Sequence, residues 1–317
     1  MVSVFFFRSR RSVQRLAMLF VVSLFVLLPY LLTACGSSGS TTGGGSTSTG
    51  LPCNNTSTSS STPVTSSATP TTTAPTDLIT PGTLTVGSDT TYPPQEFIDT
   101  ATGKAIGFDV DLITAMAQKL GLKAKIVTAN FNTIIDDLSA KRYDVVISAI
   151  SIKPERQKKA DFVPYFQSGE SLIVQKGNPR NIKCANNLCG LTAGVQDGTI
   201  ELDALNATNK TCTQAGKPAI KLTVLKDQTD VIQLLVNHRV DATYQDSPVT
   251  DYYIKQHAGQ FEIGGSVINT VPEGIAIRKG DTMMLNAMQG AFNAVKSDGT
   301  YDSLFSKWQL NASQKIS

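Results

Sequence analysis

Residues 144–156 read DVVISAISIKPER, and this stretch indicates an open α/β fold with a binding site at the edge of a sheet. The apolar residues 145–147 predict a short buried strand, so Ser148, Ser151 and Arg156 follow its carboxyl end. In open α/β sheets ligands bind at that edge. An arginine there can hold a carboxylate through two parallel hydrogen bonds, which a lysine cannot do. The alternative is a surface arginine near the start of a helix.

Short strands alternate with helices on both sides of this stretch, from Asp77 onward. The strand at 83–86 is followed by a helix that is predicted to begin at Asp109, a good N-cap, and to stop at Gly121. A strand at 125–128 and a helix that begins near Asn132 follow, and the strand before Ser148 completes this half.

A second half repeats the plan. Residues 84–91 align with 191–199, and Asp241 follows its helix at the same spacing as Asp144. Strand–helix–strand units used twice predict two α/β domains of similar build, each with a mostly parallel sheet.

The last part of the chain does not resemble a third domain, because it offers one strand at 274–277 and two helices at 284–295 and 301–308. The simplest path crosses into the second domain near Glu170 and returns near Thr270. Two crossings make a hinge with a cleft between the domains. The expected boundaries are lobe 1 at 77–170 and 271–317 and lobe 2 at 171–270.

The first residues have the pattern of an export signal. Four arginines and no acid precede an apolar run at 16–32, which is too short for a membrane span and contains Pro29. The run ends in Leu-Thr-Ala before Cys35, which resembles the lipobox of bacterial lipoproteins. That resemblance implies a signal peptide at 1–34 and a lipid on the Cys35 thiol. The alternative is an uncleaved membrane anchor.

A disordered tether is expected at 35–76. Residues 36–76 carry no charge and are almost wholly Gly, Ser, Thr, Pro, Asn and Ala, so they bury too little apolar surface to offset the entropy of ordering. The chain has 28 basic and 25 acidic residues, but four of the basic ones lie in the leader. No basic patch remains, and we expect no nucleic-acid partner.

The cysteines predict a disulfide, because an exported protein meets oxidising conditions. Cys53 lies in the tether, which leaves Cys184, Cys189 and Cys212 in the folded part. We favour the pair Cys189–Cys212, which ties the start of a strand to the end of the next helix, and Cys184–Cys189 is the alternative. No cysteine or histidine spacing suggests a metal site, and no cofactor is expected.

Four motifs in order resemble the polar amino-acid family of extracellular solute-binding proteins, the receptors of ABC importers. The motifs are GSDTTYPP at 87–94, GFDVDL at 107–112, the stretch at 148–156, and DGTYD at 298–302. The resemblance spans most of residues 77–310. It implies a two-lobe periplasmic-binding-protein-like fold, an extracytoplasmic and lipid-anchored monomer, an amino-acid ligand and an ABC permease as partner.

The resemblance also implies which residues hold the ligand. A free amino acid is a zwitterion, so its pocket needs a fixed cation and a fixed anion that face each other. Arg156 would take the α-carboxylate, with the Ser151 hydroxyl and backbone amides near Gly198 and Thr199 as further donors. Ala149 and Ile200 stand where the family more often has hydroxyl residues.

The ammonium end would lie on the second lobe. Asp246 follows the strand equivalent to the one before Ser148 and would take the α-ammonium, helped by the Ser148 hydroxyl. The alternative for Asp246 is a helix N-cap before Ser-Pro, and one carboxylate can do both. Lys153, where a small hydroxyl residue is common, would add positive charge near the carboxylate end.

The side-chain end of the ligand would meet Tyr92 and Phe131, where the family places aromatic rings that sandwich the substrate. For Phe131 the alternative is an ordinary core residue. Asp89 would lie toward the tip of the ligand, and an acid there favours lysine, arginine, histidine or glutamine. The sequence does not say which amino acid binds.

Two other functions use a similar scaffold. An enzyme resembling dehydratases would need a group for proton transfer, usually a histidine or a carboxylate of shifted pKa. The chain has only His238 and His257, both in polar stretches expected to face solvent, so no enzyme is expected. A ligand-sensing ectodomain would need a following membrane span or kinase, and the sequence ends at Ser317.

Overall fold

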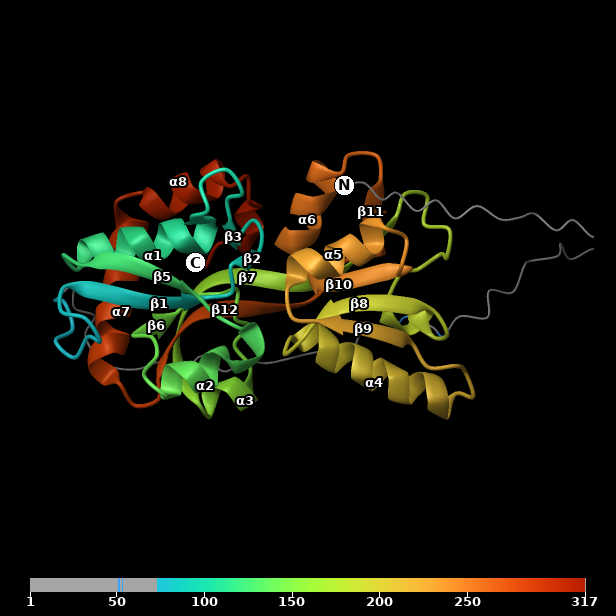
Figure 1. The fold of residues 1–317 in the computed structure, drawn as a ribbon, viewed down its shortest axis with the longest axis horizontal. Coiled ribbons are helices and arrows are strands. Elements are labelled where there is room, and N and C mark those ends of the chain that lie inside the picture. Colours follow the sequence, from blue (N-terminus) through green and yellow to red (C-terminus); the bar gives the residue numbers. More distant parts are fainter. Residues whose placement is uncertain (1–50, 52, 54–72, 317) are drawn as a thin grey trace, which may run out of the picture. The chain divides into compact units, whose positions relative to one another are not determined.

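A computed structural model describes residues 51, 53 and 73–316 (Figure 1). They belong to one of the two units into which the chain divides, Ser48–Ser317. The expected signal peptide, Cys35 and most of the tether lie outside the described residues. Within the described residues, no helix is both long enough and apolar enough to span a bilayer.

Strands and helices alternate along this body. The strands are β1 (Thr83–Ser88), β2 (Thr91–Tyr92), β3 (Glu96–Ile98), β4 (Ala105–Ile106), β5 (Lys123–Thr128), β6 (Val145–Val146), β7 (Ala160–Gln175), β8 (Thr192–Gln196), β9 (Lys221–Leu225), β10 (Ala242–Asp246), β11 (Phe261–Ile263) and β12 (Ile268–Arg278). The helices are α1 (Phe108–Lys119), α2 (Ile134–Ser139), α3 (Pro154–Gln157), α4 (Ile200–Gln214), α5 (Gln228–Val236), α6 (Ser247–Gln256), α7 (Thr282–Ser297) and α8 (Thr300–Lys307). Short 3-10 turns are η1 (Phe131–Thr133), η2 (Ala185–Leu188) and η3 (Ala312–Gln314).

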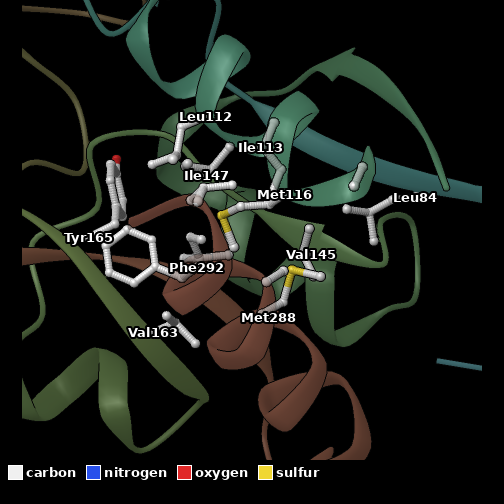
Figure 2. Close-up of a cluster of buried hydrophobic side chains, with 14 of the residues drawn as sticks. Leu84, Leu112, Ile113, Met116, Val145, Ile147, Val163, Tyr165, Met288 and Phe292 are labelled. Atoms are coloured by element: carbon white, nitrogen blue, oxygen red, sulfur yellow. The ribbon is translucent and has the colours of Figure 1, made fainter. Parts of the chain in front are cut away.

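Lobe 1 is built on β1, which lies between two parallel partners, β5 and β6. Helices α1, α7 and α8 pack together beside this sheet (Figure 1). The apolar stripe of α1, Leu112, Ile113 and Met116, is fully buried and belongs to the same core as Met288 and Phe292 of α7 (Figure 2). Burying side chains of this size stabilises the fold by roughly 1.5–3 kcal/mol each.

Lobe 2 repeats the plan, with β8 between the parallel strands β9 and β10. The repeat extends to single hydrogen bonds. In lobe 1 the Asp144 carboxylate accepts the Thr85 N–H at 2.7 Å, and in lobe 2 the Asp241 carboxylate accepts the Thr192 N–H at 2.8 Å. The two halves that the sequence aligned are therefore built in the same way.

The lobes are joined by two long strands, β7 and β12, which pair with each other in antiparallel fashion. Beyond Glu170 the strand β7 pairs with β10 of lobe 2. We expected two separate sheets, but the hydrogen bonds form one path, β5-β1-β6-β12-β7-β10-β8-β9, with β11 paired to β7. The sheets merge because β7 is long enough to belong to both. The crossings predicted near Glu170 and Thr270 fall within β7 and β12.

The start of α1 differs from the prediction. Gly107, not Asp109, occupies the N-cap position, and the Asp109 carboxylate instead accepts hydrogen bonds from the Tyr165 hydroxyl at 2.6 Å and the Ala149 N–H at 3.0 Å. A Cβ on residue 107 would lie 2.1 Å from the Gln95 carbonyl oxygen, so only glycine fits there. Asp109 is thus a buried internal carboxylate.

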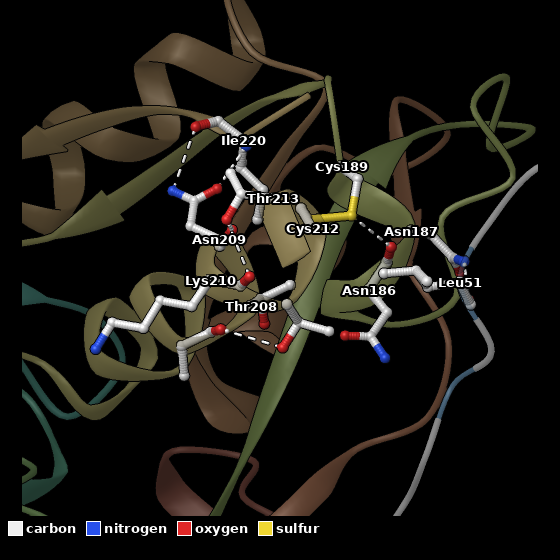
Figure 3. Close-up of a disulfide and its surroundings, with 12 residues drawn as sticks. Leu51, Asn186, Asn187, Cys189, Thr208, Asn209, Lys210, Cys212, Thr213 and Ile220 are labelled. Carbon is white, nitrogen blue, oxygen red and sulfur yellow. Dashed lines mark hydrogen bonds between the residues drawn. A yellow bond between two sulfur atoms is a disulfide. The ribbon is translucent and has the colours of Figure 1, made fainter. Parts of the chain in front are cut away.

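Two disulfides tie down lobe 2. Cys189 is bonded to Cys212, the pairing favoured from the sequence, and this bond links η2 to the last turn of α4 (Figure 3). Cys184 is bonded to Cys53, not to Cys189. The Leu51 carbonyl also accepts a hydrogen bond from a side chain of η2. A part of the expected tether is therefore fixed to lobe 2.

Candidate ligand-binding site

Residues of both lobes line a small cavity between them. Its lining comprises Tyr92, Phe131, Ala149, Ser151 and Arg156 of lobe 1 and Gln196, Thr199, Ile200, Glu201 and Asp246 of lobe 2. The enclosed space measures about 10 Å³, roughly one water molecule. The lobes are therefore closed upon each other, and anything larger enters only when they move apart.

Arg156 forms one wall of this cavity and is only 9% exposed, which excludes the surface alternative. Its guanidinium donates to the Ser151 carbonyl at 2.9 Å and, across the cleft, to the Gly198 carbonyl at 3.1 Å. It also lies over the Phe131 ring, 5.3 Å from its centroid. Two of its five N–H donors are used, so the others remain for a ligand. Burial lowers the pKa of Arg156, and the carboxylates of Glu201 and Asp246 oppose that shift.

Asp246 forms the opposite wall. It occupies the N-cap position of α6, yet its side chain makes no cap hydrogen bond. The carboxylate instead accepts from the Tyr92 hydroxyl at 2.8 Å and the Ser168 hydroxyl at 2.9 Å. Burial raises its pKa to about 6, while those two hydrogen bonds and the charge of Arg156 act in the opposite direction. The carboxylate thus faces the cleft and does not cap α6.

Glu201, which the sequence reasoning did not single out, adds a second carboxylate to the same wall. It lies in the first turn of α4 and is 1% exposed. Its buried Oε1 has no hydrogen-bond partner among the described residues. Burial, followed by the charges of Asp246 and Glu170, raises its pKa well above the usual value. An acid directly after the Gly-Thr-Ile turn was the available signal, because that turn delivers the start of α4 to the cleft.

The hydroxyls of Ser148 and Thr199 make other contacts than those the ligand would require. Ser148 does not line the cavity, because its hydroxyl donates to Glu96 at 2.9 Å and accepts the Asp89 N–H at 2.9 Å within lobe 1. The Thr199 hydroxyl accepts the Leu202 N–H at 3.2 Å and so caps α4. Neither hydroxyl is available to a ligand in this closed form.

Backbone groups of Ala149 and Gly198 are also engaged by other residues. The Ala149 N–H is directed to Asp109, away from the cavity. Gly198 lines a neighbouring groove rather than the cavity, and its carbonyl accepts from Arg156. A Cβ on residue 198 would lie 2.8 Å from the Asn132 Cα of the other lobe, so glycine permits the close approach.

Asp89 does not line the cavity either. Its carboxylate accepts a hydrogen bond from Gln196 of lobe 2 at 2.5 Å and one from the Thr91 hydroxyl at 3.0 Å. Burial raises its pKa to about 6, and these two hydrogen bonds oppose the rise. Asp89 and Gln196 thus form a bridge between the lobes beside the cavity.

Further bridges join the lobes around the cavity. Lys153 pairs with Asp203 at 2.6 Å, so its charge is directed to lobe 2 rather than left free at the carboxylate end. The Asn132 amide donates to Asp197 at 2.8 Å. Opening the cleft must break these contacts. Among the described residues, no group of three or more His, Cys, Asp or Glu side chains could hold a metal ion.

Comparison with known proteins agrees with this geometry. The family described as bacterial extracellular solute-binding proteins, family 3, matches residues 84–311. The L-cystine-binding protein TcyJ of Escherichia coli (strain K12) is 32% identical over 228 residues, 72% of this chain and 82% of that protein. The lysine/arginine/ornithine-binding periplasmic protein of the same strain is 30% identical over 236 residues, 72% of this chain and 88% of that protein.

Two solved structures that resemble this chain are also those of amino-acid-binding proteins. An ancestral arginine-binding protein bound to arginine shares 38% identity and a TM-score of 0.66, over 72% of this chain and 98% of that chain. The ancestral amino acid-binding protein AncCDT-1, a precursor of cyclohexadienyl dehydratase, shares 36% identity and a TM-score of 0.65, over 72% of this chain and 95% of that chain. All four of these proteins are amino-acid-binding proteins by name.

Proposed function

Because this chain belongs to family 3 of the bacterial extracellular solute-binding proteins, we propose that it delivers a polar or basic amino acid to an ABC importer. It binds its ligand between the lobes and does no chemistry on it. The same proposal includes the lobe boundaries 77–170 with 271–317 and 171–270.

One observation carries this proposal: Arg156 of lobe 1 and Asp246 of lobe 2 line the same buried cavity. A guanidinium and a carboxylate on opposite walls match the two charged ends of a zwitterion. Each charge-assisted hydrogen bond contributes on the order of 1.5–3 kcal/mol. A ligand that lacks its ammonium or its carboxylate should bind poorly, because the charge of Asp246 or of Arg156 would then stay buried and unpaired.

The ligand replaces bonds that now join the lobes. When the cleft opens, the ammonium takes the place of the Tyr92 hydroxyl at Asp246, and the α-carboxylate meets the unused donors of Arg156. The lobes then close on the ligand instead of on each other. Tyr92 and Phe131 are left to cover its side chain.

We further propose that the protein is exported and held at the membrane by a lipid on Cys35, as a monomer outside the cytoplasm. The arginines and apolar run of the leader support export, and the small residues before Cys35 support lipid attachment. Labelling of the cells with a radioactive fatty acid tests the anchor, with Cys35→Ala as the variant that loses the label.

The binding site is tested with a thermal-shift screen of the twenty amino acids, followed by calorimetry on the hits. We expect Arg156→Ala to weaken binding by about a hundredfold or more, because it removes the partner of a buried carboxylate. Arg142→Ala, which removes an exposed arginine of lobe 1, is the matched control and should bind normally.

Two outcomes contradict the proposal. Near-normal affinity of the Arg156→Ala protein, with its fold intact by circular dichroism, would remove the arginine from the site. A ligand that is recovered chemically altered by mass spectrometry would show turnover instead of binding.

A further inference from the structure

A second, larger cavity lies in lobe 2 beside the point where β7 leaves lobe 1. It measures about 510 Å³, within the usual range of small-molecule sites, and shares no lining residue with the interlobe cavity. Its lining comes from β7, β10, β11, the turn into β12 and the segment that carries the Cys53–Cys184 disulfide.

Glu170 supplies the anionic part of this cavity. It is 5% exposed, and its Oε1 accepts the Asn269 amide at 3.0 Å. The Tyr244 hydroxyl also hydrogen-bonds to this carboxyl, and burial raises its pKa above the usual value. Glu170 is nevertheless the acid that lines the cavity, and an ammonium that reaches it adds a charge-assisted hydrogen bond.

The rest of the lining is apolar or weakly polar, with a single base. Leu172, Ile263 and Ile268 form apolar walls, and Lys183 is exposed to solvent at the margin. Among the lining residues Glu170 is the one acid and Lys183 the one base. The cavity therefore offers a buried negative charge, an apolar middle and a positive margin.

We propose that this cavity is a second binding site, for a small molecule that carries a primary ammonium at one end and a carboxylate at the other. The ammonium enters first and donates to the Glu170 carboxylate, the apolar stem lies against Leu172 and Ile268, and the carboxylate stays near Lys183. An ammonium fits because it has three donors and no acceptor, and Glu170 is the one acid of the lining.

The position of Glu170 links this site to the hinge. Along β7 it pairs with Asp246 of β10 on one side and with Ile268 of β12 on the other. A ligand held there contacts a strand that joins the two lobes. Where its affinity differs between the open and closed forms, linkage changes the affinity of the interlobe site by the same factor.

The test uses ligand-observed NMR with 5-aminovalerate as the probe. Valerate, which lacks the ammonium, and pentylamine, which lacks the carboxylate, are the matched comparisons. Titrations are made on the Arg156→Ala/Asp246→Asn protein, in which the interlobe site is disabled. We expect saturable binding of 5-aminovalerate at millimolar concentration, and binding weaker by about tenfold or more for valerate.

Two variants in that background locate the bound probe. Glu170→Gln should weaken 5-aminovalerate binding by about tenfold or more, whereas Glu262→Gln, an acid of β11 outside the lining, should leave it unchanged. Lys183→Met should weaken 5-aminovalerate but not pentylamine. Equal binding by valerate, insensitivity to Glu170→Gln, or no binding of 5-aminovalerate overturns the proposal, and none of these results bears on the interlobe site.

Discussion

The contacts of single residues in the cleft differ from those that their local sequence indicates. Asp246 stands at the N-cap position of α6, and Pro248 follows in the first turn, so local sequence alone favours a cap. The carboxylate turns to Tyr92 and Ser168 instead, because the opposite lobe supplies a better donor than the helix end. Sequence could place Asp246 and Arg156 at strand ends, but it could not show that the Ser148 hydroxyl is taken by Glu96.

Glu201→Gln tests whether the second carboxylate of the cleft selects the ligand. We expect the preference for arginine over its neutral analogue citrulline to fall by about tenfold or more, because the amide keeps the shape of Glu201 and removes its charge. The ligand-free protein should melt at a higher temperature, because burying a neutral amide costs less free energy than burying a charged carboxylate.

Calorimetry with both ligands gives the ratio, and differential scanning calorimetry gives the melting temperature. Glu155→Gln, in the first turn of α3, is the control acid from the opposite lobe. An unchanged arginine-to-citrulline ratio would mean that Glu201 does not meet the side chain of the ligand.

At the scale of elements, the internal repeat was the most reliable signal in the sequence. The shared spacing of Asp144 and Asp241 predicted equivalent strands, and the structure gives both the same contact. A backbone hydrogen bond runs in the other direction between the same residues. The Asp144 N–H donates to the Thr85 carbonyl at 2.8 Å, and the Asp241 N–H donates to the Thr192 carbonyl at 3.0 Å. Two-way pairing of this kind fixes β6 to β1 in lobe 1 and β10 to β8 in lobe 2.

Removing these carboxylates should destabilise the two lobes unequally. Asp144→Ala leaves the buried N–H of Thr85 and the partly buried N–H of Ile79 without acceptors, and we expect the free energy of unfolding to fall by about 2–4 kcal/mol. Asp241→Ala should cost less, about 1–2 kcal/mol, because its side chain is partly exposed and water can replace it.

Urea denaturation measures both values, with Asp230→Ala on the exposed surface of α5 as the control. Equal losses of unfolding free energy in Asp144→Ala and Asp241→Ala would show that the burial of the carboxylate does not determine the loss.

At the scale of the whole molecule, sequence predicted the two crossings but not how the lobes meet. Periodicity reports which residues are buried within a lobe, and it carries no information on contacts such as Lys153–Asp203 or Gln196–Asp89, which exist only when the cleft is closed. The sequence did not predict β7, and it predicted β12 only at 274–277, because a strand shared by the two lobes has no distinct local pattern.

The stability of the closed form should depend on pH through two buried carboxyls of the cleft, those of Asp246 and Asp89. Burial raises the pKa of Asp246 and of Asp89 from 3.8 to about 6 in this closed, ligand-free form. Between about pH 4 and 6 this form holds protons that the unfolded chain has lost, so its free energy of unfolding falls as the pH rises through that window.

Ligand affinity should change in the opposite sense. An ammonium requires ionised Asp246, so we expect the dissociation constant to be constant above about pH 7 and to increase below about pH 6, by at most about tenfold per pH unit and group. Calorimetry from pH 5 to 8 measures it, and Asp89→Asn should remove only the part due to Asp89. An affinity that stays constant down to pH 5 would show that Asp246 remains ionised without a ligand.

The Cys53–Cys184 disulfide attaches the polar segment at 36–76 to the folded body at a second point. Cys53 is fixed to lobe 2, whereas Leu78 packs on the core of lobe 1, so residues 54–72 connect two points of the same folded particle. Hydrolysis of a peptide bond anywhere in that interval leaves the molecule in one piece. If Cys35 carries a lipid, a cut within residues 54–72 leaves the Cys53–Cys184 disulfide as the covalent route from the lipid to the receptor, so shedding after such a cut also requires a reductant.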